Sequence, residues 1–579
     1  MPTFRSLSRR DTVLIFLGAI SMQLLGAVLP SNTTNIPANH PDFRTKDALN
    51  ARADYELLHT PQPITVTREI RIMATPSSIP VAPIPTPVGV MGTLPETTVI
   101  SHAPGWTLFK DVYMAGGTLF VVSSEPQSSF ADPRYMISNP MIALNTPENI
   151  AAREPTESNI CWLSPTIAKK WWGGDVKAGE RNRIWSVEGG TVLNNDPPQF
   201  LDHYYHFVGE FLMGVQAFWT SAFSPENHYL DPTALPKQDK PPRGSIQPES
   251  DDHSIPPISR LIFANLQPSE WRDKPGFNAY FLRAAFPSVG VEVMYDWEDR
   301  VAATTVPEDK TYTRAWHFPY LLLHERSASF RGDWCGGKVH RIAAEAIEKA
   351  RVEGRLMKSW WAQVRQRVLA FAGADSEDDV MEPASLATRG TAMETRMPRK
   401  VVLTYLSRQD VRRHLLDADH RALVKALRDY VKQKNIEWAA DATGKKREWE
   451  LVIAKGESMT KDEQVRLFGR TSILLGVHGN GLTHMVMMPP SSISTVIEMF
   501  YPSGFVHDYE WTAKALGHRY FGTWNDTYFT DHNLPSFVNY PDGFQGTEIS
   551  ITPSIVTEII ESRFTSIFST HRHARPPHI

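Results

Sequence analysis

Gly476-Val477-His478-Gly479-Asn480-Gly481-Leu482-Thr483 is the stretch that decides the fold. An apolar run over 472–477 is interrupted by glycines, and apolar residues resume at Leu482. This pattern predicts a buried strand, a tight turn and a helix whose first turn starts near Leu482. Without Cβ atoms, Gly479 and Gly481 allow another group close to the main chain, and the N–H groups that start the helix favour an anion. A diphosphate suits this position; an ordinary strand-to-helix turn is the alternative.

Short apolar runs alternate with helical segments on both sides of this stretch. We expect strands over 401–406, 451–454, 472–477 and 495–499, and helices over 419–431, 461–470 and 482–488. This alternation predicts an α/β fold with a parallel sheet and helices on both faces. In such a sheet the ligand crevice lies beyond the carboxyl ends of the strands, where the loops after these runs meet.

Composition divides the chain of 579 residues into six segments. We expect a cytoplasmic tail and transmembrane signal anchor over 1–30 and a Pro/Ser/Thr-rich stem over 31–97. A first domain follows over 98–373, with a Pro-rich surface loop at 231–257 and helical periodicity over 339–371. A linker over 374–399 leads to a second domain over 400–545, and 546–579 forms a C-terminal helix and tail with an apolar stripe over 555–568.

The N-terminal segment suggests a membrane protein of the secretory pathway. Arg5, Arg9 and Arg10 precede an apolar segment over 12–29, which would span roughly 27 Å as a helix. Basic residues upstream favour a cytoplasmic N-terminus and a lumenal body, hence a single-pass type II protein of the Golgi or endoplasmic reticulum. A cleaved signal peptide is the alternative, although 26–29 is a poor cleavage site. Sequons at Asn32 and Asn525 agree with a lumenal route.

Charge and cysteine content exclude several classes of protein. The chain carries 60 basic and 64 acidic side chains, so no general attraction to nucleic acid is expected. Cys161 and Cys335 are its two cysteines, which excludes a disulfide framework and a cysteine-rich zinc site. They form either one bridge or two separate thiols.

Several residue patterns offer candidate chemistry, each with an alternative. Arg408 follows a predicted strand and can neutralise a pyrophosphate, or it caps a strand end on the surface. Asp417-Ala418-Asp419 matches an Asp-x-Asp pattern that holds manganese in some enzymes, but its position before a helix favours capping. His203, His206 and Glu210 resemble a metal cluster without a further ligand. Trp171-Trp172 and Trp360-Trp361 either stack on sugar rings or pack in the core.

The glycine stretch, followed by Val496-Ile497-Glu498-Met499-Phe500, resembles the signature of the glycosyltransferase 61 family. The segment 406–413 is similar to the family's serine-arginine segment, and 204–210 is similar to its histidine-plus-acid helix. The segment 323–332 is similar to one that precedes the linker. Together these segments run from His203 to Pro502 in the family's order.

The resemblance implies a GT-B architecture, in which two Rossmann-like domains face each other across a cleft. The second domain would hold a UDP-sugar and the first would face the acceptor. The implied reaction is an inverting transfer of xylose or N-acetylglucosamine to a hydroxyl of a glycan or glycoprotein, with no tightly bound cofactor and no requirement for a divalent metal. Asn480 and His484 depart from the family's pattern. A non-catalytic glycan-binding or scaffold protein that keeps the fold is the alternative.

The resemblance and the chemistry together assign roles. Arg408 would stabilise the leaving diphosphate, and His206 with Glu210, four residues apart on one helix face, would activate or position the acceptor hydroxyl. Glu498 would accept hydrogen bonds from ribose hydroxyls. The predicted catalytic residues are therefore His206, Glu210 and Arg408, and the predicted donor-binding residues are Ser407, Arg412, His478, Gly479, Asn480, Gly481, Leu482, Thr483 and Glu498.

Overall fold

The computed structural model describes residues 94–141, 146–173, 183–223, 255–305, 314–330, 342–356, 360–374, 398–439 and 448–572. All of them belong to one compact unit, Val88–Ile579. The expected tail, anchor and linker lie wholly or largely outside the described residues, as do most of the stem and of the loop at 231–257. In the part of the chain that is described, no helix is long and apolar enough to cross a membrane.

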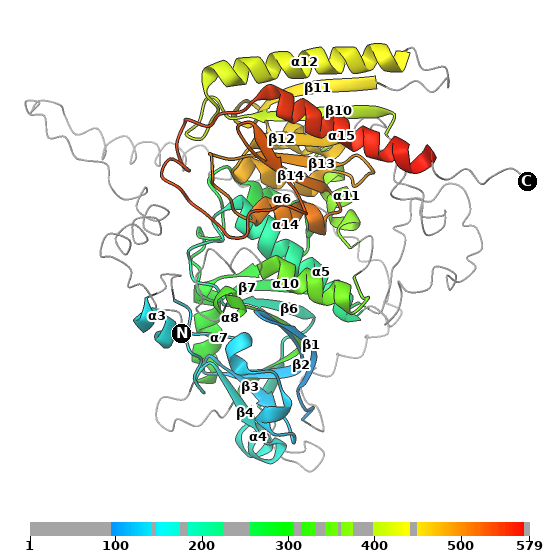
Figure 1. Ribbon diagram of the computed structural model, residues 1–579. Helices are drawn as coiled ribbons and strands as arrows, with labels where there is room; N and C mark the ends of the chain where they lie inside the picture. Colours follow the sequence, from blue (N-terminus) through cyan, green and yellow to red (C-terminus); the bar gives the residue numbers. More distant parts are fainter. Residues whose placement is uncertain are drawn as a thin grey trace, which may run out of the picture. The chain divides into compact units, whose positions relative to one another are not determined.

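The C-terminal half is built on a six-stranded sheet in the order β11-β10-β12-β13-β14-β15 (Figure 1). All neighbouring strands are parallel except β14 and β15, so the predicted parallel sheet is confirmed. Chain order reverses between β10 and β12, and open α/β sheets bind their ligands at such a switch point. The strands are β10 (Lys400–Ser407), β11 (Glu448–Lys455), β12 (Ile473–Val477), β13 (Thr495–Met499), β14 (Arg519–Trp524) and β15 (Thr527–Phe529).

Helices cover both faces of this sheet (Figure 1). α12 (Asp417–Ala439) and α15 (Pro553–Arg572) pack on one face, and α13 (Lys461–Arg470), α14 (Asp508–Ala515) and η8 (Asn480–Met487) pack on the other. The predicted C-terminal helix is therefore confirmed as part of α15. The helix predicted to start near Leu482 begins two residues earlier, at Asn480. It is a 3₁₀ helix, in which the Leu482 N–H donates to the Gly479 carbonyl.

The N-terminal half is built on a nine-stranded mixed sheet. Its parallel part has the order β9-β6-β7-β8, so chain order reverses between β6 and β9 and creates a second switch point. Antiparallel strands extend the sheet beyond β9, so this half is Rossmann-like only in part. The strands are β1 (Thr98–Ala103), β2 (Trp106–Ala115), β3 (Thr118–Val122), β4 (Ile160–Leu163), β5 (Ile184–Ser186), β6 (Gly190–Asn194), β7 (Ile258–Phe263), β8 (Gly290–Glu292) and β9 (Ala315–His324).

The helices of this half include a π-helix, η5 (Tyr205–Leu212), which continues directly into α5 (Met213–Phe223). The region predicted to be helical over 339–371 contains α10 (Ile342–Val352) and α11 (Ala362–Phe371). The other helices are α3 (Pro147–Ala152), α4 (Pro165–Trp172), α6 (Phe277–Ala285), α7 (Met294–Thr304) and α8 (Arg326–Phe330), with short 3₁₀ turns at Gln127–Ser129 and Pro133–Tyr135.

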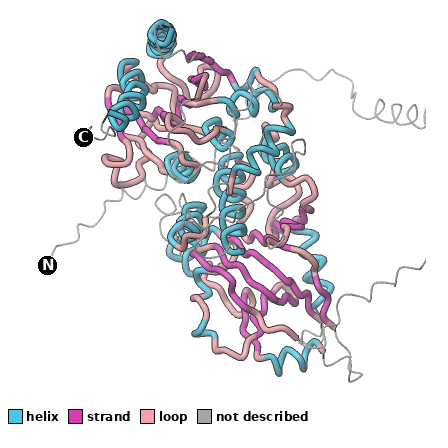
Figure 2. The backbone as a smooth tube through the Cα atoms, turned by 90° about the vertical axis from the view of Figure 1, so that its right-hand side faces the viewer, coloured by secondary structure: helices cyan, strands magenta, loops and turns pink. Residues whose placement is uncertain are grey.

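One hydrophobic core joins the two halves, and helices fill the space between their strands (Figure 2). Trp361 packs parallel to the ring of Phe281, and its indole Nε1 donates to the Val486 carbonyl over 2.8 Å. The ring of His484 lies 4.8 Å from that of Phe277 and 5.3 Å from that of Tyr204 between centroids, both in the N-terminal half. The two halves therefore share their interior and do not form separate compact bodies.

The tryptophan pairs, one cysteine and one sequon lie in the described part of the chain. Trp172, Trp360 and Trp361 are buried, so these tryptophans pack in the core and do not present a face to a sugar. Cys161 is half-buried in β4, and Cys335 lies outside the described residues. Asn525 is exposed in the turn between β14 and β15.

Replacing Trp361 with alanine should lower the free energy of unfolding by about 3–5 kcal/mol, because the change removes a buried indole and leaves a cavity between the halves. Trp185 exposes 48% of its surface, so Trp185→Ala should change the same quantity by less than about 1 kcal/mol. Urea unfolding followed by circular dichroism measures both. Equal stability of the two variants would show that the shared core does not hold the halves together.

Stability should also depend on pH through His484. Burial lowers the pKa of His484 to about 3, whereas an unfolded histidine titrates near about 6.5. Between these values the unfolded chain binds a proton that the folded chain does not, so the free energy of unfolding should fall as the pH drops. His484→Gln should remove up to about 1.4 kcal/mol per pH unit of this fall. An unchanged slope between neutral and mildly acidic urea titrations would contradict a neutral, buried His484.

Candidate active site

The glycine turn lies at the carboxyl end of β12, at the switch point of the C-terminal sheet. Gly479 has a positive φ of 145°, which glycine adopts without the strain that a side chain would cause. A Cβ at Gly479 would overlap Nη1 of Arg408, and a Cβ at Gly481 would overlap the side chain of Leu406. The glycines therefore leave bare main chain against which an arginine lies directly.

Arg408 follows β10, the neighbour of β12. Its Nη1 donates a hydrogen bond of 3.2 Å to the carbonyl of His478, the residue before Gly479. The side chain is half-buried, and burial, with a smaller contribution from the positive charge of Arg412, lowers the pKa of Arg408. A guanidinium nevertheless stays charged at neutral pH. The structure thus brings together the arginine and the turn that the sequence pointed to separately.

Two more arginines follow in the loop after β10. Arg412 is exposed, and its Nη2 donates to Gln545 Oε1 over 2.8 Å. Arg413 is half-buried, and its Nε and Nη1 atoms are buried without a hydrogen-bond partner among the described residues. Burial, and then repulsion by Arg408, lowers the pKa of Arg413 to about 10, so it remains a cation at neutral pH. A bound anion would supply the acceptor that these buried nitrogens lack.

The sequence analysis named Arg412 as a donor-binding residue and missed Arg413. Both follow the strand that ends at Ser407, and nothing in the sequence distinguishes two consecutive arginines. The path of the loop decides which guanidinium turns inward, and here it is that of Arg413.

Glu498 takes a position different from the one expected for a ribose ligand. It lies in β13 and is fully buried. Its Oε1 lies 2.6 Å from His478 Nδ1, and its Oε2 accepts a hydrogen bond of 2.7 Å from the Tyr520 hydroxyl. Burial raises the pKa of Glu498 well above its ordinary value. Both oxygens are occupied by protein, so Glu498 orients the ring of His478 and does not face a ribose.

The remaining residues that were predicted to bind the donor support the turn. Ser407, Leu482 and Thr483 are buried, and Leu482 belongs to the shared core. The Asn480 side chain points to the N-terminal half, where its Oδ1 accepts a 3.0 Å hydrogen bond from the main-chain N–H of Tyr205. The departures from the family pattern at Asn480 and His484 are therefore both explained by contacts between the halves.

Buried charges gather at the switch point of the N-terminal sheet. Asp196 follows β6 and Arg326 follows β9, and the Arg326 main-chain N–H donates to Asp196 Oδ1 over 2.7 Å. His324 Nε2 lies 3.5 Å from Asp196 Oδ2. Burial alone would raise the pKa of Asp196, but His324 and Arg326 outweigh it and lower the pKa to about 2. Asp196 is therefore a buried carboxylate that holds Arg326 in place.

The chain of charges continues to the helix that carries the predicted catalytic pair. Arg326 Nη1 lies 2.6 Å from Glu210 Oε2, and the same oxygen lies 2.6 Å from His206 Nδ1. Burial alone would raise the pKa of Glu210, but Arg326 and then His206 lower it to about 2. The His206 side chain keeps 13% exposure, against 1% for Glu210. Glu210 thus orients an imidazole whose Nε2 is left for other partners.

The first residue of η5 connects this pair to the glycine turn. Besides the bond of its N–H to Asn480, Tyr205 donates from its hydroxyl to the Asp508 carbonyl over 2.7 Å. His206 is the next residue along the chain. Arg413 contributes to the lowered pKa of His203, to about 3, after burial and after His206, so the inward cation lies close to the same helix. His206 therefore follows the residue that is bonded to the glycine turn, and Arg408 lies against the same turn.

Two residue patterns that resemble metal ligands have other positions in the described part of the chain. Asp417 and Asp419 lie in the first turn of α12, as expected for residues that complement a helix N-terminus, and Asp419 Oδ2 accepts from the Ile551 N–H over 3.1 Å. Among the described residues, no group of three or more His, Cys, Asp or Glu side chains is placed to hold a metal ion.

Comparison with known proteins gives one family. A search of curated proteins finds no match. The family model described as Glycosyltransferase 61 matches residues 204–497, which include both switch-point clusters except Asp196 and Glu498. This match covers about half of the 579 residues, so the chain belongs to the glycosyltransferase 61 family.

Proposed function

We propose that this chain is an inverting glycosyltransferase that transfers xylose or N-acetylglucosamine from a UDP-sugar to a hydroxyl of a glycan or glycoprotein. Family membership implies a glycosyltransferase with a sugar donor and a glycan acceptor. The choice of UDP and of these two sugars rests on the resemblance of the sequence. We further propose a GT-B arrangement, with the C-terminal half as the donor lobe, and a single-pass type II protein of the Golgi or endoplasmic reticulum with a lumenal body.

The observation that carries the proposal is the contact of Arg408 with the glycine turn at the β10/β12 switch point, together with the inward guanidinium of Arg413, whose pKa is lowered by burial and then by Arg408. A diphosphate bound there accepts hydrogen bonds from both guanidinium groups, including the buried nitrogens of Arg413 that lack a partner. The N–H groups of Asn480 and Gly481 precede the first internal bond of η8 and add aligned dipoles. His478 packs against Phe500 and Phe544 beside the glycine turn.

His206 supplies the base on the acceptor side. Its Nδ1 is engaged by Glu210, so its Nε2 accepts the proton of the acceptor hydroxyl. The Glu210 carboxylate, kept ionised by Arg326, stabilises the imidazolium that forms. The pair acts as a unit in which Glu210 orients and His206 transfers the proton.

The proposed transfer is a single displacement at the anomeric carbon. The acceptor oxygen forms a bond to the anomeric carbon and loses its proton to His206, while the bond from that carbon to the phosphate oxygen breaks. The electron pair leaves with the diphosphate, whose growing charge Arg408 and Arg413 stabilise more strongly in the transition state than in the bound donor. Two fixed cations perform here the role that a divalent metal has in other transferases, so the proposal requires no metal.

The alternative function is a non-catalytic glycan-binding or scaffold protein that keeps the fold. This alternative was suggested by Asn480 and His484, which depart from the residues usual in the family's sequence pattern. Both residues have contacts between the halves that account for them: Asn480 contacts Tyr205, and the His484 ring contacts the rings of Tyr204 and Phe277. The structure therefore gives no separate observation in favour of this alternative.

Arg408→Ala and Arg413→Ala should each lose about 2–4 kcal/mol of transition-state stabilisation, measured as kcat/KM in a screen of UDP-sugars that includes UDP-xylose and UDP-N-acetylglucosamine. The matched control is Arg412→Ala, which removes the exposed neighbour and should cost less than about 1 kcal/mol.

Two outcomes would contradict this assignment. We call Arg408 and Arg413 the diphosphate clamp. If Arg412→Ala lowered kcat/KM as much as Arg413→Ala does, Arg413 would not belong to this clamp. The melting temperature gives a second readout, because UDP should raise that of the unmodified protein and raise it less in the two clamp variants. Glycan binding without any stabilisation by UDP would favour the scaffold alternative.

His206→Ala should lower kcat by roughly 10²–10⁴-fold while the KM for the UDP-sugar changes little, because the base acts on the acceptor proton and not on the donor. Glu210→Gln should lower kcat less, since it keeps the side-chain shape but loses the charge that stabilises the imidazolium. His532→Ala, at an exposed position, is the control. A His206→Ala enzyme that folds and turns over at the normal rate would remove His206 from the reaction.

A further inference from the structure

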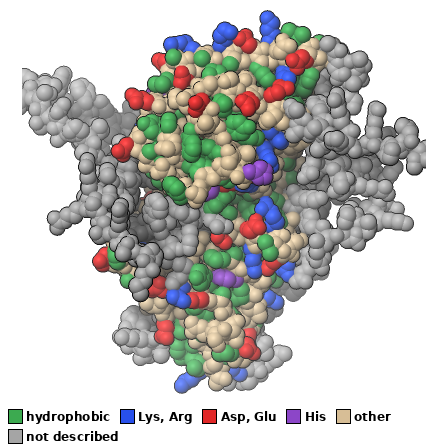
Figure 3. Space-filling view, viewed as in Figure 1, with side chains coloured by type: hydrophobic (Ala, Val, Ile, Leu, Met, Phe, Trp, Pro, Cys, Tyr) green, Lys and Arg blue, Asp and Glu red, His purple; other side chains and the backbone are tan. Residues whose placement is uncertain are grey.

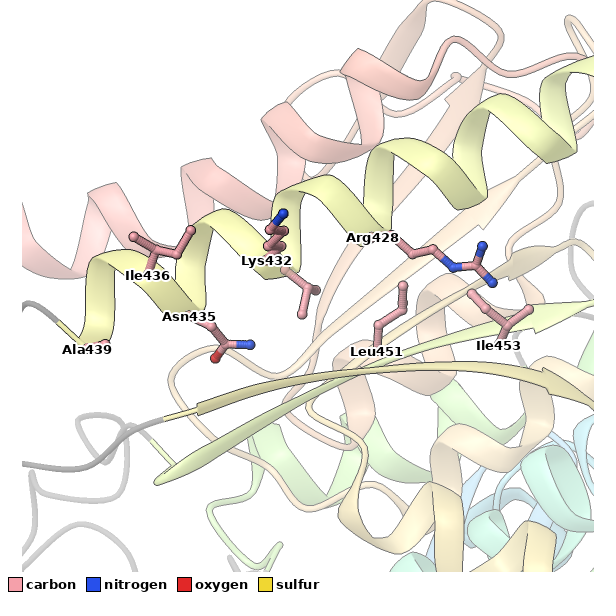
Figure 4. A pocket seen from close by; sticks show the side chains of 8 residues that line it. Arg428, Lys432, Asn435, Ile436, Ala439, Leu451 and Ile453 are labelled. Atoms are coloured by element: carbon pink, nitrogen blue, oxygen red, sulfur yellow. The ribbon is translucent and has the colours of Figure 1, made fainter.

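A groove lies on the outer edge of the C-terminal sheet, on structural elements that do not form the proposed active site (Figure 4). This groove of about 640 Å³ runs between α12 and the edge strand β11. Val431, Leu451 and Ile453 give it an apolar floor, and Ile436 at its rim exposes 56% of its surface. Its rim also carries Arg428 and Lys432, which are both exposed.

The floor of this groove contains an open strand edge. β11 pairs with β10 on one side, and its Glu448 N–H donates to Arg399. Peptide groups alternate in direction along a strand, so those of residues 449, 451 and 453 point outward. Asn435 occupies the first of these, since its side chain accepts from the Trp449 N–H over 2.7 Å and donates to the Trp449 carbonyl over 2.9 Å. Leu451 and Ile453 follow with their outward N–H and C=O groups facing the groove, and no partner on this side is recorded in the described chain.

The charges around the groove are unbalanced. Basic side chains are visible over α12 (Figure 3). Lys425 is paired with Asp429 at 2.6 Å, and Lys434 is paired with Glu437 and Glu561. Within the described residues, Arg428 and Lys432 have no ion pair. The two cations that line the groove are thus available to an acidic partner.

The spacing of these cations matches an extended chain. Positions four apart on a helix are separated by about 6 Å along its axis, and alternate residues of a strand by about 6.6 Å. A second copy of this chain paired edge to edge would bring Arg428 and Lys432 of one copy toward the same cations of the other, which like-charge repulsion opposes.

We propose that the α12/β11 groove binds an extended segment of a partner protein that adds as a strand to β11 and carries acidic side chains at alternate positions. The peptide groups of Leu451 and Ile453 give main-chain hydrogen bonds, and the acidic side chains of the segment lie on the α12 face of the sheet with their methylene groups over the apolar floor. Arg428 and Lys432 pair with the acidic side chains. The site lies apart from the proposed transferase chemistry and does not depend on it.

Fluorescence polarisation with the full chain tests this proposal. The probe is a labelled synthetic peptide of about seven residues that alternates valine and glutamate, a typical strand length. The peptide should bind, and the double variant Arg428→Glu, Lys432→Glu should weaken binding by about tenfold or more. The matched control, Lys169→Glu with Lys170→Glu on α4, makes the same change of charge at exposed positions and should bind as the unmodified protein does.

Two altered peptides decide the mode of binding. A lysine version should not bind, and a version with proline at its centre, which removes a main-chain donor, should bind at least several-fold more weakly. Failure of the glutamate peptide to bind, or equal binding of either altered peptide, would overturn the proposal. A dimer in sedimentation velocity that the Arg428→Glu, Lys432→Glu change dissociates would overturn it in favour of a second copy. Both double variants should retain transfer activity. A loss of peptide binding therefore tests the groove alone, and a loss of transfer activity tests the proposed reaction alone.

Discussion

The hydrogen bond between the Tyr205 main-chain N–H and Asn480 Oδ1 is the contact on which the arrangement of the site depends. The first N–H groups of a helix lack partners within the helix, and the asparagine of the glycine turn satisfies one of them from the other half of the molecule. Since His206 follows Tyr205 and Gly479 precedes Asn480, one bond sets the proposed base beside the proposed diphosphate clamp. The shared core around Trp361 and His484 then keeps this bond from opening.

Both halves place their charges at a switch point, but the signs are opposite. The C-terminal switch point carries Arg408 and Arg413 beside bare main chain, whereas the N-terminal one carries Asp196 and Glu210 around a single Arg326. A parallel sheet gathers strand ends on one edge, and a reversal of strand order opens a gap between two of them. The fold therefore supplies two adjacent positions for charge, and the residues at each decide what the position can stabilise.

Local patterns predicted the C-terminal half well. Apolar runs and helical periodicity located β10, β12, β13, α13 and α15. The buried face of each of these elements is visible in the apolar pattern of its own residues. Features that arise from contacts between distant segments were not predictable. The inward turn of Arg413, the burial of Glu498 between His478 and Tyr520, and the antiparallel extension of the first sheet belong to this class.

The candidate site shows the same division. The residue types of His206, Glu210 and Arg408 were readable from the sequence, and their spacing put the first two on one helix face. The residues that hold Glu210 were not readable from the sequence. Arg326 lies in the segment 323–332, to which the family resemblance assigned no function, and Asp196 lies outside every motif. A carboxylate that orients a histidine must itself be held, and the residue that holds it can come from any strand end that reaches it.

The opposite signs of the two clusters bear on the direction of the proposed reaction. Burial, and then the positive charge of Arg408, lowers the pKa of Arg413, because two cations in a half-buried place repel each other. A diphosphate relieves this repulsion, and it does so more as negative charge grows on the leaving group. On the other side, the Glu210 carboxylate is in contact with His206 and stabilises the positive charge that a proton brings to the imidazole. Proton transfer to one half and departure of the diphosphate into the other therefore lower the electrostatic free energy together, which is the coupling that a single displacement requires.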